Sequence, residues 1–140
     1  MPPKVSVVIP VYNVGKQLEK CLDSVVAQTF PDIEIIVVND GSTDNSPEII
    51  ARYADEDSRI VVIDKSNEGL AYARKSGIEA AQGEYIQHLD GDDFLEPDAI
   101  ELLYNTAIEE KADMVVFPFW FDYAVSYTHL RAHETGAYLV

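Results

Sequence analysis

The chain has 140 residues, 47% of them hydrophobic, which is enough to build the core of one domain of ordinary size. Ten Lys and Arg stand against 25 Asp and Glu, and the resulting formal net charge of −15 disfavours nucleic acid and anionic lipid surfaces as partners. An anionic ligand would need local positive charge, from a metal ion or a helix N-terminus.

The N-terminus has no signal-peptide pattern, and no apolar run approaches the roughly 18 residues that a membrane span requires. We therefore expect a cytoplasmic chain, with attachment to a membrane surface left open for the full-length protein.

Short β-branched runs alternate with helical patterns along most of the chain. We expect strands at 5–10, 33–38, 59–64, 85–89 and 114–119, and helices at 15–27, 46–53, 69–82 and 97–111. The single Cys21 lies on the apolar face of the first helix and is predicted to be buried, and Gly83 is predicted to end the third helix in the left-handed conformation. Strands joined by helical crossovers run parallel, so the pattern predicts an α/β fold whose mostly parallel sheet has helices on both faces.

The composition changes after Tyr123. Residues 124–140 lose the acidic bias and show no clear periodicity. We interpret 1–123 as one domain and 124–140 as a tail that is either non-native in origin or a genuine terminal helix or strand.

An acidic turn follows the fourth predicted strand. Asp90, Asp92 and Asp93 fall within four residues, and Gly91 lets the backbone bend between them. Carboxylates this close repel one another, and a hard divalent cation such as Mg²⁺ or Mn²⁺ would compensate their charge. A solvated acidic turn is the simpler alternative for an isolated D-x-D pattern. A calcium-binding EF-hand does not fit, because Phe94 and Leu95 occupy loop positions that require an oxygen ligand and glycine.

Polar loops follow the other predicted parallel strands, and ligands of open α/β sheets bind at this carboxyl edge. These loops are P-V-Y-N at 10–13, N-D-G-S-T-D at 39–44 and K-S-N-E-G-L-A-Y-A-R at 65–74. Together with the acidic turn they offer an aromatic ring, carboxylates, a helix N-terminus and the guanidinium of Arg74, a set that suits a nucleoside diphosphate. Each residue also has a structural alternative: Asp40 and Asp44 could build turns and helix caps, and Arg74 could pair with Glu68 or Glu79 on the surface.

Four motifs in order resemble the N-terminal part of family 2 glycosyltransferases, which are inverting enzymes with the GT-A fold. The motifs are V-S-V-V-I-P-V-Y-N, I-I-V-V-N-D-G-S-T-D, N-E-G-L-A-Y-A-R-K-S-G-I-E-A-A-Q-G-E-Y-I and H-L-D-G-D-D, and they cover about 5–119. Each motif is weak alone, but the ordered set is specific. The resemblance implies a GT-A, Rossmann-like sheet that is incomplete at the C-terminus.

The resemblance also implies a site for the nucleotide-sugar donor. In it Tyr12 lies near the base with Pro10 and Asn13 beside it, Asp40 hydrogen-bonds the base or ribose, and the sugar and diphosphate side is lined by Asn67, Gly69 and Arg74. Asp90 and Asp92 would hold ribose and the metal, Mn²⁺ or Mg²⁺, with Asp93 as a further ligand or a neighbour of the ligands.

The implied reaction is direct displacement at the anomeric carbon of a nucleotide sugar, with a UDP-sugar favoured. The acceptor is a hydroxyl of a glycan, lipid or other molecule, in the synthesis of cell-surface polysaccharide or glycoconjugate. The family places its general base downstream of the residues in this chain, so no catalytic base is assigned here. Two alternatives remain open: a non-catalytic nucleotide-binding fragment, and a phosphatase of the haloacid dehalogenase class, which also uses a strand followed by D-x-D. A dinucleotide dehydrogenase is disfavoured, because no G-x-G-x-x-G follows the first strand.

Overall fold

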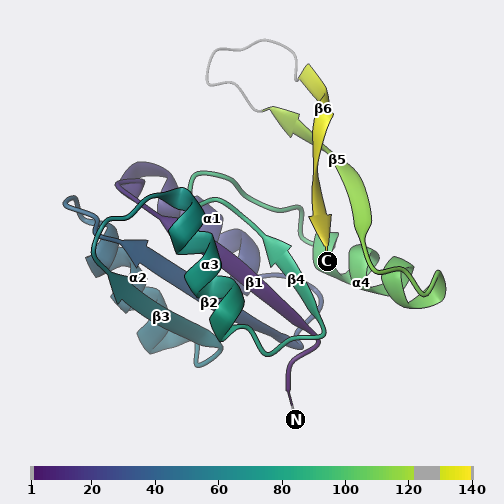
Figure 1. Ribbon diagram of the computed structural model, residues 1–140, viewed down its shortest axis with the longest axis horizontal. Helices are drawn as coiled ribbons and strands as arrows, with labels where there is room; N and C mark the ends of the chain where they lie inside the picture. Colours follow the sequence, from purple (N-terminus) through teal and green to yellow (C-terminus); the bar gives the residue numbers. More distant parts are fainter. Residues whose placement is uncertain (1, 122–129, 140) are drawn as a thin grey trace.

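The computed structural model describes residues 2–121 and 130–139, and it describes side chains through residue 115. One sheet of six strands forms its centre, in the order β3-β2-β1-β4-β6-β5 (Figure 1). Its strands are β1 (Val5–Val11), β2 (Ile33–Asp40), β3 (Ile60–Lys65), β4 (Tyr85–His88), β5 (Val115–Phe121) and β6 (Leu130–Leu139). The helices are α1 (Gly15–Val26), α2 (Ser46–Glu56), α3 (Leu70–Ala80) and α4 (Ala99–Glu109).

Strands β1 to β4 pair in parallel, as the alternation of strand and helix predicts. Strand β6 departs from that pattern, because it runs antiparallel to both β4 and β5 and separates them. This strand falls in the tail at 124–140, for which a terminal strand was one of the alternatives left open. The rest of that tail, 124–129 and 140, lies outside the described residues.

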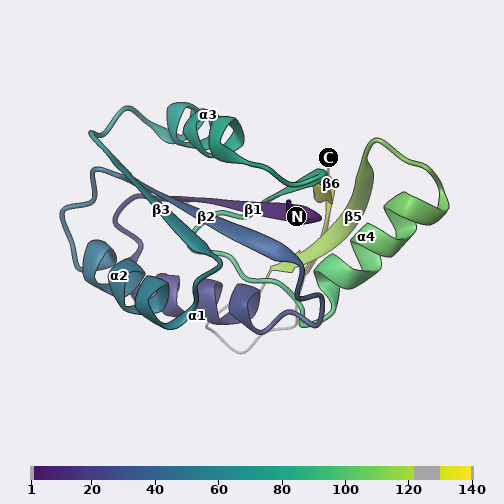
Figure 2. The same ribbon diagram turned by 90° about the horizontal axis from the view of Figure 1, so that it is seen from below.

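Helices cover both faces of the sheet, which confirms the predicted layers. Figure 2 shows α3 on one face and α1, α2 and α4 on the other. The larger core lies on the three-helix side and includes Ile9 and Ile35 of the sheet, Leu22 of α1 and Ile100 of α4. A smaller core under α3 contains Ile36, Val38 and Ala73. All seven residues of β1 are buried, and its sequence is β-branched except at Ser6 and Pro10, in place of the alternation typical of a strand with one exposed face.

The prediction for Gly83 is wrong. Helix α3 ends at Ala80 in an extended cap at Ala81, and the described glycines with positive φ are Gly41 and Gly69. Gly83 instead packs against β1, where an added Cβ would lie 2.7 Å from the backbone nitrogen of Ser6. Its backbone N–H donates to the Ser6 hydroxyl at 2.8 Å. Glycine is needed here for close approach of two segments.

Within the described residues, none of the helices combines the length and the apolar character needed to cross a bilayer.

Candidate functional site

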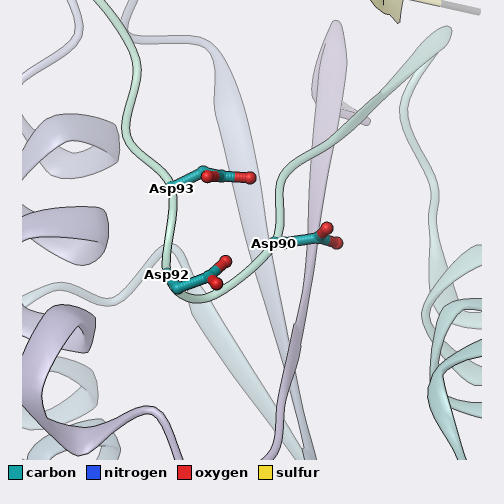
Figure 3. A group of neighbouring side chains, drawn as sticks. All are labelled: Asp90, Asp92 and Asp93. Atoms are coloured by element: carbon teal, nitrogen blue, oxygen red, sulfur yellow. The ribbon is translucent and has the colours of Figure 1, made fainter. Parts of the chain in front are cut away.

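The acidic turn lies at the carboxyl end of β4, in a segment without helix or strand that continues to α4. Asp90, Asp92 and Asp93 each bring a carboxylate oxygen within 4.8 Å of the others (Figure 3). The backbone N–H of Asp93 donates to the carbonyl of Asp90 at 3.0 Å and closes the turn. Partial burial, followed by the negative charges of Asp92 and Asp90, raises the pKa of Asp93 above its ordinary value.

This arrangement fits a hard divalent cation. The group offers oxygen ligands only, which are the ligands that Mg²⁺ and Mn²⁺ prefer, and Asp92 and Asp93 are exposed to solvent. After desolvation, the negative charges of Asp92 and Asp90 contribute to the raised pKa of Asp93, and a cation would offset that repulsion. A metal ion bound here would retain open positions for water or for phosphate oxygens.

Arg74 of α3 supplies a positive charge beside the turn. Its Nη2 donates to Oδ1 of Asp90 at 2.9 Å, and both side chains are more than one third exposed. The surface alternatives for Arg74 are therefore corrected: Glu68 pairs with Lys65 at 2.8 Å, and Glu79 lies 4.0 Å from Lys75. Arg74 lies on the partly buried side of α3, so it faces the end of β4. Its Nε is buried without a hydrogen-bond partner, which leaves a donor group unused beside the turn.

Asp40 connects the end of β2 to the loop that precedes α3. Its Oδ1 accepts from the backbone N–H of Glu68 and its Oδ2 from that of Gly69, both at 3.0 Å. The side-chain amide of Asn67 donates to the Asp40 carbonyl at 3.0 Å. Gly69 has φ of +103°, a left-handed conformation that favours glycine. Asp40 is only 2% exposed, so its first task in this structure is to shape the loop at 67–69.

Asn13 connects the loop after β1 to the loop after β2. Its Oδ1 accepts from the backbone N–H of Thr43 at 2.7 Å, and its own N–H donates to the Ser42 hydroxyl at 3.1 Å. Asp44 in the same loop accepts from the N–H of Gly15, at the start of α1, and from that of Ser46, at the start of α2. Asp44 thus caps the starts of both helices, which is the structural role considered for it in the sequence analysis. Tyr12 is half exposed at this edge, and Pro10 is buried at the end of β1.

The structure therefore brings the predicted site residues to one edge of the sheet. The order β3-β2-β1-β4 places the four polar loops side by side, and the contacts Asp40–Asn67, Asn13–Thr43 and Arg74–Asp90 connect neighbouring segments. Gly91 lies against the end of β1, where an added Cβ would be 3.2 Å from the Pro10 carbonyl.

Polar residues of α1 and of the segment just after it, behind the acidic turn, were not predicted as part of the site. Ser24 and Gln28 hydrogen-bond the segment after the turn, and the buried Cys21 thiol lies 3.6 Å from the Asp90 carbonyl. The position of Ser24 three residues after Cys21 on an otherwise apolar helix face is a sequence signal that could have identified it, whereas Gln28 lies beyond the end of α1.

Known proteins support the family resemblance. The family model described as Glycosyl transferase family 2 matches residues 6–136. Glycosyltransferase GlyA of Streptococcus pneumoniae is 47% identical over 113 residues, which are 81% of this chain and 16% of that protein. The uncharacterized glycosyltransferase EpsJ of Bacillus subtilis is 47% identical over 115 residues, 82% of this chain and 33% of EpsJ.

Solved structures agree with the sequence relatives. TarS of S. aureus in complex with UDP superposes with a TM-score of 0.75 at 28% identity, covering 79% of this chain and 34% of that one. The mannosyltransferase PcManGT from Pyrobaculum calidifontis, in complex with GDP-Man and Mn²⁺, gives 0.67 at 29% identity, covering 81% and 33%. This chain thus spans about a third or less of the length of these relatives. With a match over nearly its whole length and a sheet shared with GT-A enzymes, the chain belongs to glycosyl transferase family 2.

Proposed function

We propose that this chain forms the part of an inverting, metal-dependent glycosyltransferase that binds the nucleotide sugar. The convergence of three carboxylates beside Arg74 at the carboxyl edge of the sheet is the observation that carries the proposal. A UDP-sugar is favoured, because TarS was crystallised in complex with UDP and with UDP-GlcNAc. The acceptor is a hydroxyl group in cell-surface polysaccharide or glycoconjugate synthesis, in line with the chondroitin synthase of Pasteurella multocida, which is 40% identical over 115 residues.

Metal binding is proposed for Asp90, Asp92 and Asp93. The metal ion would stabilise negative charge on the leaving diphosphate as a Lewis acid. PcManGT, whose structure contains Mn²⁺ with GDP-Man, supports Mn²⁺ as the ion to test first, with Mg²⁺ as the alternative.

The nucleoside side is proposed to lie over the loops after β1 and β2. The exposed ring of Tyr12 would stack on the base, with Pro10 and Asn13 beside it. Asp40 would contact the base or ribose through Oδ1, which accepts one hydrogen bond and retains a lone pair.

The diphosphate side is proposed to lie between α3 and the acidic turn. Asn67 and Gly69 would line it at the N-terminus of α3, where the helix presents free N–H groups to an anion. Arg74 would release Asp90 and turn its guanidinium, including the unused Nε, toward the phosphates. No residue of this chain is proposed as the general base for the acceptor.

Calorimetric titration with UDP, in Mn²⁺ and in EDTA, tests this proposal. The wild-type chain is expected to bind UDP only with Mn²⁺, and Asp92→Asn is expected to weaken that binding at least about tenfold, the loss typical of a disturbed metal site. Asp98→Asn, which removes the same charge from the exposed residue before α4, is the matched control and should bind like wild type. Parallel titrations with GDP and TDP show which nucleotide base the site prefers.

Absence of binding to UDP, GDP and TDP would contradict the proposed function. The phosphatase alternative predicts a different result: release of phosphate from simple phosphomonoesters, abolished by Asp90→Asn. Metal-dependent UDP binding without transferase activity would match the non-catalytic fragment.

A further inference from the structure

The segment between β4 and α4 carries the three carboxylates, yet it contains no regular secondary structure of its own. A metal site needs its ligands held in place, and a loop does this only where neighbouring elements fix its backbone. The structure shows one element in contact with both ends of the turn, and that element is α1.

The first contact lies at the start of the turn. Cys21 is fully buried, and its Sγ lies 3.6 Å from the carbonyl of Asp90, within reach of a weak S–H donor. This contact connects α1 to the first residue of the turn.

The second contact lies just after the turn. The Ser24 hydroxyl accepts from the backbone N–H of Leu95 at 3.1 Å and donates to the carbonyl of Cys21 at 2.6 Å. Asp92 and Asp93 thus lie between two residues that contact α1: Asp90, next to Cys21, and Leu95, next to Ser24.

The third contact uses both ends of the Gln28 side-chain amide. Nε2 donates to the carbonyl of Glu96 at 2.7 Å and to that of Ser24 at 2.9 Å, while Oε1 accepts from the N–H of Ile100 at 3.0 Å. Ile100 is the second residue of α4, so its N–H has no partner within the helix, and Asp98 at the N-cap makes no side-chain hydrogen bond. Gln28, 7% exposed, caps α4 from the segment just after α1.

We infer that Ser24 and Gln28 are positioning residues for metal binding, which hold the acidic turn in its ligating geometry from behind. This inference rests on the proposed function, because it assigns residues that act on the proposed metal site through the backbone. Neither side chain touches the metal. Loss of either contact would free one end of the turn and weaken Mn²⁺ binding, while the nucleoside side, formed by other loops, would be unaffected.

The test is titration of Mn²⁺ into the 140-residue chain in a fixed excess of UDP, well below the melting temperature of each variant. Ser24→Ala removes the acceptor for Leu95, and we expect Mn²⁺ affinity to fall about tenfold. Gln28→Ala should have at least that effect, but it leaves the buried N–H of Ile100 without a partner and could unfold the chain. If Gln28→Ala does not fold, Ser24→Ala alone tests the inference.

Tyr53→Phe is the matched control. The Tyr53 hydroxyl of α2 donates to Asp23, the neighbour of Ser24 on α1, so this variant disturbs α1 without touching the acidic turn. Its Mn²⁺ affinity should stay within about twofold of wild type, since the exposed hydrogen bonds that are lost, to Asp23 and to the Glu19 carbonyl, do not involve the turn.

Wild-type affinity in Ser24→Ala would overturn the inference while leaving the proposed function intact. An equal loss in Ser24→Ala and Tyr53→Phe would also overturn it, because general destabilisation of α1 would then be the cause. Absence of Mn²⁺ binding in the wild-type chain would overturn the proposed function and the inference together.

Discussion

At the scale of single residues, Asp93 shows how a binding site is built at the expense of stability. Although Asp93 is exposed, partial desolvation of its carboxyl group, followed by the charges of Asp92 and Asp90, raises its pKa. A carboxyl whose pKa is higher in the folded state favours folding most when it is protonated. Its ionisation, as the pH rises from the ordinary Asp range toward the raised value, therefore removes stability from the metal-free protein.

Asp93→Asn should accordingly raise the melting temperature of the metal-free chain at pH 7. The gain should shrink as the pH falls below the ordinary value of an Asp carboxyl, where the wild-type side chain is protonated as well. Differential scanning calorimetry between pH 3 and pH 7 measures the effect, and Asp98→Asn serves as the charge-matched control. A lower melting temperature at pH 7 would show that Asp93 makes a favourable contact in the absence of metal.

Cys21 and Arg74 show what the residue pattern could and could not predict. The position of Cys21 on an apolar helix face was enough to predict its burial, which is confirmed. The partner of Arg74 could not be read from helical spacing, because Asp90 is 16 residues away and meets Arg74 only once β4 lies beside β1 under α3. Helical spacing correctly relates Lys75 to Glu79, whose contact is local.

At the scale of elements, local pattern predicts most of the architecture. The β-branched runs and apolar helix faces before residue 110 correspond to β1 to β4 and α1 to α4, with boundaries that shift by a few residues. Strand β2, for example, extends through Asn39 and Asp40, which were expected in a loop. Strand β6 was missed, because its sequence contains no β-branched run between Leu130 and Leu139 beyond a single Thr.

The loop between β3 and α3 provides a prediction at this scale. Asp40 at the end of β2 accepts two backbone N–H groups of that loop, and replacing the carboxylate by an amide loses charge and turns a donor toward them. Asp40→Asn should therefore lower the free energy of unfolding by about 1–3 kcal/mol, the typical cost of a disrupted buried hydrogen bond.

Urea denaturation measures that loss in the absence of nucleotide. Asp64→Asn is the control, because Asp64 lies at the exposed end of β3 and its Oδ1 can still accept from Asn39 after the change. Equal stability of Asp40→Asn and wild type would mean that the Asp40 contacts do not order the loop, and would favour a role in ligand contact alone.

At the scale of the whole molecule, the net charge of −15 affects the stability of the folded chain as well as its ligands. Repulsion among exposed carboxylates destabilises the compact state, and salt screens it over about 10 Å at 0.1 M ionic strength. We expect the melting temperature of the metal-free chain to rise as NaCl is increased to about 0.3 M, where the Debye length falls to about 6 Å and repulsion between carboxylates farther apart than that is largely screened.

Specific metal binding should remain visible in that salt. A ligand at about one hundred times its Kd stabilises the folded state by about 2.7 kcal/mol, so millimolar Mn²⁺ should raise the melting temperature further. The same Mn²⁺ should add little to Asp92→Asn. If NaCl alone reproduced the whole effect of Mn²⁺ in the wild-type chain, the ion would be acting as a general counterion.

The central claim is that Asp90, Asp92 and Asp93 hold a divalent metal ion on which a nucleoside diphosphate binds. Anomalous diffraction from crystals of the chain grown with Mn²⁺ and UDP tests it most directly. The account predicts one strong manganese peak among these three carboxylates, with diphosphate density in contact with it and Arg74 turned away from Asp90. Manganese bound elsewhere, or UDP bound with this turn empty and the Arg74–Asp90 pair intact, would contradict it.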